Sequence, residues 1–293
     1  MFMAYLFLIL STLFWSGNFV LSRGIADIIP PVTLGYFRWI TAFLILLPFT
    51  FKLIYRHNHL ILKHIRYLMA LAFLGVAAFN TLIYKAMHYT TAINAVLVTS
   101  FIPILILIIS SGVYKEKPTR IQLVGILVSI TGIATIILKA DIKRLIQLSI
   151  NTGDLLVLIA AFSWAAYSVM LKSFPSELHP LVFLQSIIFL GLVILTPFYF
   201  AELHFKGGFP INPATVVSIL YIGLFASVLA FICWNKAVRE IGANNAGPFV
   251  HLMPVFGTIF AIIFLGEKVA YYHLVGIMLV FTGILISTKG FGK

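Results

Sequence analysis

The stretch FLGEKVAYYHLVG, residues 264–276, places Glu267 and a neighbouring lysine between two long apolar runs. A second stretch, GVYKEKPTRIQLVG at residues 112–125, has the same pattern. A shift of 151 positions lays Glu116 on Glu267, and the lysine and the LVG triplet that follow also coincide. The chain therefore carries one charged hinge twice, which indicates an internal duplication.

The duplication extends through most of the chain. In the later part of each copy the offset is 151, and near the start of each copy it is 149. Matched pairs are Lys85/Lys236, Asn94/Asn245, Pro103/Pro254, Gly132/Gly283, Trp15/Trp164, Arg23/Lys172 and Pro31/Pro180. Residues 1–145 and 146–293 are predicted to be two copies of a five-helix unit. Because five is odd, the second copy enters the membrane from the opposite side, as in inverted-repeat transporters.

Composition places the protein in a membrane. The chain is 61% hydrophobic and only 10% charged, with a mean hydropathy of +1.09, whereas soluble domains are about 25% charged. Its apolar segments are long enough for membrane helices and lack the alternation of barrel strands. Ten spans are predicted, at 3–22, 32–51, 67–86, 91–111, 120–138, 153–171, 180–200, 214–235, 245–265 and 271–288. The fold class is therefore all-α integral membrane, with ten transmembrane helices as two inverted repeats.

The basic residues indicate orientation rather than nucleic-acid binding. The net charge is +12, but lysine and arginine lie mostly in short loops, where they set topology. With the N-terminus inside, the inner segments hold twelve of them and the outer segments seven, which favours cytoplasmic termini. The first span is expected to be a retained helix, since no basic region or cleavage motif accompanies it. The segment from Asp141, DIKRLIQL, is predicted to be a short interfacial helix.

Two roles are open for the repeated hinge glutamates, Glu116 and Glu267. Each precedes a predicted helix start, where a carboxylate suits the positive end of the helix dipole. The other interpretation is a gate, since inversion places one hinge on each face of the membrane.

Carboxylates are expected only in loops or at span ends. The eight are Asp27, Glu116, Asp141, Asp154, Glu177, Glu202, Glu240 and Glu267. A membrane-embedded carboxylate is the usual carrier of a cation or proton in a transporter. Its predicted absence argues against a cation/proton antiporter.

Arg38 is the exceptional charge, about seven residues into the second span. An arginine at that depth is costly and tends to face a cavity or a partner. One interpretation is that it receives a substrate carboxylate through paired hydrogen bonds. The other is that it holds helices together by bonding to backbone carbonyls.

Further candidates for substrate binding are polar or aromatic groups inside predicted spans. Trp15 and Asn18 share one face of the first span, and Trp164 and Tyr167 share the matching face of the sixth. Polar groups are expensive against lipid and should face inward. They are Asn80, Tyr84, Asn94, Trp234 and His251. For each, helix packing is the competing interpretation; no metal site and no cofactor are predicted.

The sequence resembles the drug/metabolite transporter superfamily, in its ten-helix EamA-type branch. The resemblance rests on the duplicated halves, on FWSGNFVLSR and FRWITAFLILLP, and on the span ends FIPILILIISSGVYKEK and LMPVFGTIFAIIFLGEK. It implies that helices 1–4 and 6–9 surround a central cavity and that helices 5 and 10 lie outside it. That agrees with the small-residue stripe Gly125, Ser129 and Gly132 on the fifth span, which suits close helix packing.

The predicted function is secondary transport. Small metabolites, above all amino acids and related zwitterionic or weakly acidic compounds, would be exported across a bacterial inner membrane by alternating access, by a monomer or a homodimer in contact with lipid. Export of amines or cationic drugs is the alternative, with aromatic faces holding the charge. A membrane-embedded enzyme lacks its nucleophile, base or metal cluster here, and a pure scaffold leaves the intramembrane asparagines without a purpose.

Overall fold

The computed structural model describes residues 1–25, 27–141, 143, 151–265 and 268–289, and within them every regular element is helical. The first half contains α1 (Phe2–Gly24), α2 (Pro31–Lys63), α3 (Ile65–Leu71), η1 (Ala72–Ala78), α4 (Phe79–Ala86), α5 (Ala92–Thr99), α6 (Ile102–Tyr114) and α7 (Arg120–Ile137). The second contains α9 (Thr152–Met170), η2 (Leu171–Ser173), α10 (Pro180–Lys206), α11 (Pro213–Tyr221), η3 (Ile222–Leu229), α12 (Ala230–Ile241), α13 (Ala243–Ala246), η4 (Gly247–His251), α14 (Leu252–Leu265) and α15 (Tyr271–Lys289).

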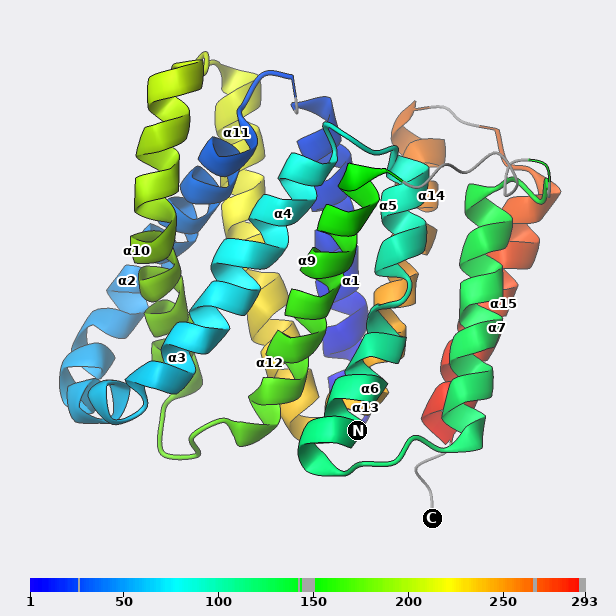
Figure 1. Cartoon of the computed structure of the whole chain (residues 1–293), viewed down its shortest axis with the longest axis horizontal. Helices are drawn as coiled ribbons and strands as arrows, with labels where there is room; N and C mark the ends of the chain where they lie inside the picture. The colour runs from blue at the N-terminus through cyan, green and yellow to red at the C-terminus, as the bar shows by residue number, and fades with distance from the viewer. Residues whose placement is uncertain (26, 142, 144–150, 266–267, 290–293) are drawn as a thin grey trace.

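These elements join into ten candidate membrane spans within the described residues, which confirms the predicted fold class. The spans stand side by side, and α1 begins at the same end at which α15 finishes (Figure 1). We call this end, at the bottom of Figure 1, the lower end, and the opposite one the upper end. The α6–α7, α9–α10 and α12–α13 connections lie at the lower end.

Local sequence sets where the helices begin and end. Proline opens α2, α10 and α11, where its fixed φ suits the first turn. Capping boxes open α7 through Thr119 and α9 through Asn151. Gly242, at φ 82°, ends α12 in a conformation that suits glycine. The predicted interfacial helix after Asp141 falls largely outside the described residues.

The second span is longer than predicted. It was expected to end near residue 51, yet α2 continues to Lys63 and is 33 residues long. At about 1.5 Å per residue it exceeds a hydrocarbon core of about 30 Å. Neither glycine nor proline interrupts residues 49–63, so the helix continues although its side chains become basic.

Contacts between repeat-related residues locate the pseudo-twofold axis. The His251 Nε2–H donates to the carbonyl oxygen of Ser100 at 2.9 Å, and these residues are 151 positions apart. The indole rings of Trp15 and Trp164, 149 apart, meet edge to face with centroids 5.0 Å apart. Equivalent residues of two copies can touch only next to the axis that relates them. The axis therefore passes close to both contacts, beside the indole rings of Trp15 and Trp164.

The fifth and tenth spans pair with each other at one side of the bundle. Figure 1 shows α7 and α15 side by side, away from the other helices. A Cβ atom added at Gly125 would lie 2.4 Å from the backbone nitrogen of Ser287, and one at Gly283 would lie 2.5 Å from the carbonyl oxygen of Gly125. The predicted small-residue stripe is thus the α7–α15 contact, where two backbones approach closely.

Two matching helices change winding in mid-membrane. The segments η1 and η3 are π-helical, with hydrogen bonds one residue longer than in an α-helix. They occupy equivalent positions in the two repeats, at an offset of about 151. Such widened turns leave carbonyl groups available to side chains and recur at functional sites.

Candidate substrate-binding site

Arg38 lies on α2 in the middle of the bundle and is fully buried. Its Nε–H donates to Ser227 Oγ at 2.7 Å, and Nη1 donates to Asn80 Oδ1 at 2.7 Å and to the Tyr84 hydroxyl at 2.9 Å. Its Nη2 donates to the carbonyl oxygen of Ala226 at 3.1 Å. These four acceptors are all neutral. Among the residues that the structure describes, no carboxylate pairs with Arg38.

Two buried donors at this point have hydrogens to spare. A guanidinium carries five N–H groups, and the four bonds above leave one N–H of Arg38 Nη2 without a partner in the described chain. The Asn80 Nδ2 group is buried and likewise has no hydrogen-bond partner there. A buried donor without an acceptor costs about 1–3 kcal/mol. The site therefore suits a ligand that brings acceptor oxygens, above all a carboxylate.

An aromatic cluster surrounds the axis beside Arg38. The Trp234 ring lies 5.4 Å from Trp15 and 5.6 Å from Trp164, and Tyr167 stacks on Trp164 at 5.2 Å, measured between centroids. All four side chains are buried. They come from α1, α9 and α12, so both repeats contribute. The cluster offers apolar ring faces next to a fixed positive charge.

Hydrogen bonds fix these rings and connect them to the polar groups. The Tyr167 hydroxyl donates to Asn235 Oδ1 at 2.8 Å, and Trp234 Nε1 donates to Ser168 Oγ at 3.2 Å. On the other side, the Tyr84 hydroxyl donates to Asn18 Oδ1 at 3.1 Å. The predicted residue Asn18 therefore lies two hydrogen bonds from Arg38.

The π-helical turns supply the acceptors that hold this arrangement. The carbonyl oxygen of Ala226, in η3, accepts from Trp15 Nε1 at 3.0 Å as well as from Arg38. In η1, the carbonyl oxygen of Val76 accepts from Trp39 Nε1 at 3.1 Å. Gly75 in η1 also lets the Tyr167 ring come close, because a Cβ atom added at Gly75 would lie 2.5 Å from the Cδ2 atom of Tyr167.

Two of the ten predicted residues lie elsewhere. Asn94, in α5, donates from Nδ2 to Asp154 Oδ2 at 3.1 Å near the upper ends of α5 and α9. His251, the last residue of η4, is fully buried next to the axis, where its Nε2–H donates to the carbonyl oxygen of Ser100. The remaining eight are Trp15, Asn18, Arg38, Asn80, Tyr84, Trp164, Tyr167 and Trp234. These gather around Arg38 and the aromatic cluster.

Three residues of the site were absent from the sequence prediction. Ser227 binds Arg38 Nε; the Trp39 ring lies 4.9 Å from the Arg38 guanidinium; and the Phe231 ring contacts Trp39 and Trp164 at 5.1 and 5.5 Å. Trp39 adjoins Arg38 in sequence and offered a signal. Ser227 did not, because a lone serine in a span usually bonds its own helix, as Ser227 also does to Ile222.

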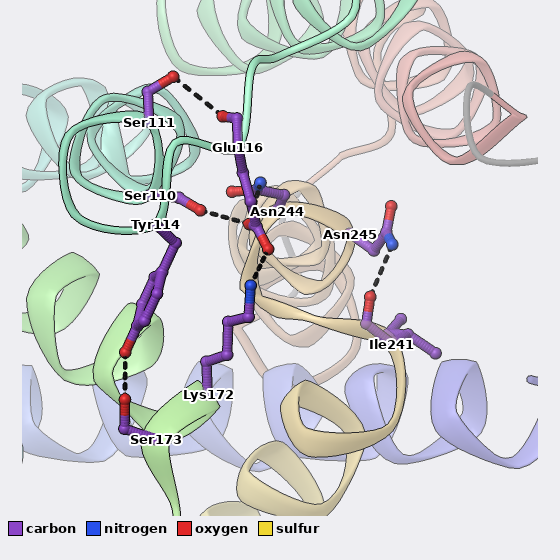
Figure 2. A network of polar contacts seen from close by, with 9 residues as sticks. All are labelled: Ser110, Ser111, Tyr114, Glu116, Lys172, Ser173, Ile241, Asn244 and Asn245. Atoms are coloured by element: carbon purple, nitrogen blue, oxygen red, sulfur yellow. Dashed lines mark hydrogen bonds and ion pairs between the residues drawn. The ribbon is translucent and has the colours of Figure 1, made fainter.

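A second polar cluster joins the two repeats at the lower end (Figure 2). The Glu116 carboxylate, in the α6–α7 connection, accepts hydrogen bonds from Ser110 at 2.5 Å, from Asn244 Nδ2 at 2.9 Å and from Lys172 Nζ. Lys172 belongs to η2 and Asn244 to α13, both in the second repeat. We call Glu116, Lys172 and Asn244 the lower clamp.

The lower clamp adds a role for the hinge glutamate, because Glu116 binds the second repeat. Glu116 does not cap α7, because Thr119 and Gln122 form the capping box there. Burial alone would raise the pKa of Glu116, but hydrogen bonds from Lys172 and Ser110, with the Lys172 charge, lower it below its ordinary 4.5. The group is an ionised partner of the second repeat. Its counterpart Glu267 lies outside the described residues.

Two cavities adjoin at the lower end. One, of about 480 Å³, lies between α10 and α12 and includes Phe183, Asn235 and Lys236 in its lining. The other, of about 350 Å³, is lined by residues that include Glu116 and Lys172. Phe174 and Arg239 line both. The larger cavity thus reaches Asn235, the partner of Tyr167 in the aromatic cluster.

Comparison with known proteins identifies the family. The sequence pattern of the EamA-like transporter family matches twice, at residues 2–138 and 151–289. The chain is 26% identical to an uncharacterized transporter of Archaeoglobus fulgidus, over 97% of this chain and 96% of that one. It is 27% identical to the uncharacterized transporter YyaM of Bacillus subtilis, over 75% and 72% of the two chains.

Two further matches add a named role and a fold. A protein of Salmonella typhimurium named as a probable amino-acid metabolite efflux pump is 27% identical over 61% of each chain. A solved crystal structure superposes with a TM-score of 0.78 at 15% identity, over 98% of this chain and 96% of that one; at that identity the likeness concerns the fold alone. With both halves matched, this multi-pass membrane protein belongs to the EamA-like transporter family.

Proposed function

We propose that the protein is a secondary transporter for amino acids or related zwitterionic or weakly acidic metabolites, working by alternating access. The observation that carries this proposal is Arg38, fully buried among neutral acceptors. A buried charge without a counter-ion is costly. A substrate carboxylate would supply that counter-ion, and the spare N–H groups of Arg38 and Asn80 would donate to it.

The surroundings of Arg38 support the same substrate class. The rings of Trp15, Trp164 and Tyr167 offer an apolar surface for a side chain. The name of the Salmonella relative, a probable amino-acid metabolite efflux pump, agrees with this chemistry.

In alternating access, the two inverted repeats would move against each other and the lower clamp would close one end. Glu116 ties the first repeat to Lys172 and Asn244 of the second, so opening the lower end must break these bonds. Rocking of the two halves about a midplane site is the general mechanism for such repeats. Because basic residues concentrate at the lower end, we place that end and both termini in the cytoplasm of a bacterial cell and propose net export across the inner membrane.

The proposed mode is facilitated diffusion or exchange. The seven described carboxylates lie in loops or near helix ends, so we assign no proton carrier in the middle of the membrane. An amine exporter is the second candidate, favoured by the clustered ring faces that can hold a cation. The charge on Arg38 opposes it, because two buried positive charges repel each other.

The mode is tested with purified protein in liposomes loaded with labelled amino acids. Efflux is followed with and without a pH gradient while the membrane potential is held constant. We expect the same amino-acid efflux in both conditions. Efflux that collapses when the pH gradient is dissipated would refute facilitated diffusion, and gradient-driven efflux of amines alone would overturn the substrate class as well.

A further inference from the structure

The two adjoining cavities at the lower end combine a cationic rim with an apolar wall. Arg239 and Lys236 line the larger cavity together with Phe174, Leu181, Phe183 and Leu184, and Arg239 also lines the smaller one. Both basic side chains are exposed. An amphiphilic lining of this kind fits a ligand with one charged group and an apolar body.

Arg239 is held in place by an aromatic ring and has no hydrogen-bonding partner among the residues that the structure describes. Its guanidinium lies over the Phe174 ring, 3.5 Å from the centroid. Within the described residues it makes neither a hydrogen bond nor an ion pair. Stacking on an aromatic face fixes the plane of the guanidinium and leaves its N–H edge available, the edge that binds a carboxylate through two parallel bonds.

The charges around the rim favour an anion. Of the two carboxylates that line the cavities, Glu116 is engaged by Lys172, Ser110 and Asn244. Glu240 lies 2.9 Å from the amino group of Met1. Lys236 lies over the Phe7 ring, 4.7 Å from the centroid, and makes no ion pair within the described chain. The two basic groups without a carboxylate partner are thus those of the larger cavity.

The larger cavity reaches a residue that contacts the aromatic cluster. Asn235 lines it, and Asn235 Oδ1 accepts the hydrogen bond from Tyr167, which stacks on Trp164 in the aromatic cluster. A ligand in this cavity is therefore one side chain away from the central site.

We infer that the two adjoining cavities, which we together call the vestibule, form a second recognition site. In it, Arg239 binds the carboxylate of an incoming substrate, and the apolar wall with Phe174 and Phe183 holds the apolar side chain of that substrate. This inference rests on the proposed function, because its ligand is the transported carboxylate. Arg239 would act before Arg38, and its removal would weaken capture without abolishing binding at the centre.

The test measures binding, not transport. Full-length protein in nanodiscs of neutral lipid is titrated with labelled phenylacetate, and the isosteric neutral amide, phenylacetamide, serves as the uncharged probe. In Arg239→Gln we expect the Kd for phenylacetate to rise about five- to tenfold, since one charge-assisted pair is lost. The Kd for phenylacetamide should not change. Arg120→Gln is the matched control: it removes the same charge at the same end, outside both cavities.

A second measurement locates the ligand independently of the arginine variant. Ser176 lines the smaller cavity and is exposed, so Ser176→Cys in a Cys233→Ser background gives a single accessible thiol. Phenylacetate should slow its reaction with maleimide, and phenylacetamide should do so far less. Equal effects of acid and amide, or of Arg239→Gln and Arg120→Gln, would overturn the inference. So would a vestibule that binds anionic lipid but no phenylacetate in neutral discs.

The outcomes separate this inference from the proposed function. Carboxylate efflux that depends on Arg38 but keeps its KM in Arg239→Gln would refute the vestibule and leave the function standing. Binding of phenylacetate that depends on Arg239, in a protein that moves no carboxylate, would support the vestibule and refute the proposed function.

Discussion

Arg38 and Lys172 are two basic side chains that differ in burial and in the charge of their hydrogen-bond partners. Lys172 lies half-exposed at the lower end and pairs with Glu116. Arg38 lies fully buried at the centre and, within the described residues, bonds only to neutral oxygens. Placing the pairing carboxylate at the surface and none at the centre is the reverse of what stability alone would favour, because desolvated charges need partners most.

In the proposed function, the contrast separates a contact that closes the lower end from a site that binds substrate. The Lys172–Glu116 pair links the repeats where water screens it, so the bond is weak enough to break in each cycle. In the proposed function, Arg38 has no counter-ion until a substrate carboxylate supplies one. A transporter needs both properties, a reversible closure and an unsatisfied centre.

Removing each cation in turn should give the largest difference between the two regions. Arg38→Leu should lower carboxylate transport by about 100-fold, since a buried charged hydrogen-bond network contributes about 2–5 kcal/mol. Lys172→Leu should change transport only several-fold. Equal losses in liposome efflux would contradict the distinction.

A substitution in the α7–α15 pair should damage the fold and spare the site. Gly125→Val places methyl groups against the Ser287 backbone, and such overpacking costs about 1–3 kcal/mol. We expect a lower Tm in detergent and an unchanged KM for the protein that remains folded. Gly112→Val is the control, since nothing lies within 4 Å of a Cβ added there. A raised KM would show that α7 and α15 shape the central site.

Weakening the lower clamp should open that end a few-fold. Glu116→Gln keeps the shape but removes the charge that holds Lys172, and the exposed pair is worth less than about 1 kcal/mol. The reaction of maleimide with Ala243→Cys, in a Cys233→Ser background, should therefore accelerate a few-fold. Glu177→Gln is the control, because its partner Lys63 is 4.0 Å away and both are more exposed. An unchanged rate would mean that Glu116 does not close the end.

The clamp should also show a small pH dependence. The pKa of Glu116 is lower in the folded protein than its ordinary 4.5. Its contribution to stability is therefore complete above that value and is lost as the pH falls through the depressed pKa. The Tm difference between wild type and Glu116→Gln should shrink in that acidic range. A difference that grows on acidification would contradict the assignment of an ionised clamp.

The sequence was sufficient to predict the helices and most of the residues that meet around Arg38. The hinge repeat at Glu116 and Glu267, with long apolar spans, predicts ten inverted helices, and charge or aromaticity inside a span singled out Arg38 and Trp164. What periodicity could not predict is the winding of η1 and η3, because α- and π-helical turns share the same composition. The carbonyl of Ala226 and the hydroxyl of Ser227 therefore escaped notice.

Two predictions, the end of the second span and the position of Asn94, differ from the structure because both rested on hydropathy. The prediction ended the second span where apolar residues stop, yet α2 continues to Lys63 because nothing in the sequence breaks the backbone hydrogen bonding. Asn94 was grouped with the central residues because hydropathy gives depth only coarsely. It lies near the start of α5, beside Asp154.

The central claim is that Arg38 selects carboxylates, and paired efflux tests it most directly. Liposomes are loaded with labelled amino acids or with the amines that lack only their carboxylates, and wild type is compared with Arg38→Gln at equal pH on both sides. We predict that the wild type moves amino acids in preference to the amines, and that Arg38→Gln loses this preference mainly through slower amino-acid efflux. Preferential amine efflux by the wild type, undiminished in the variant, would contradict it.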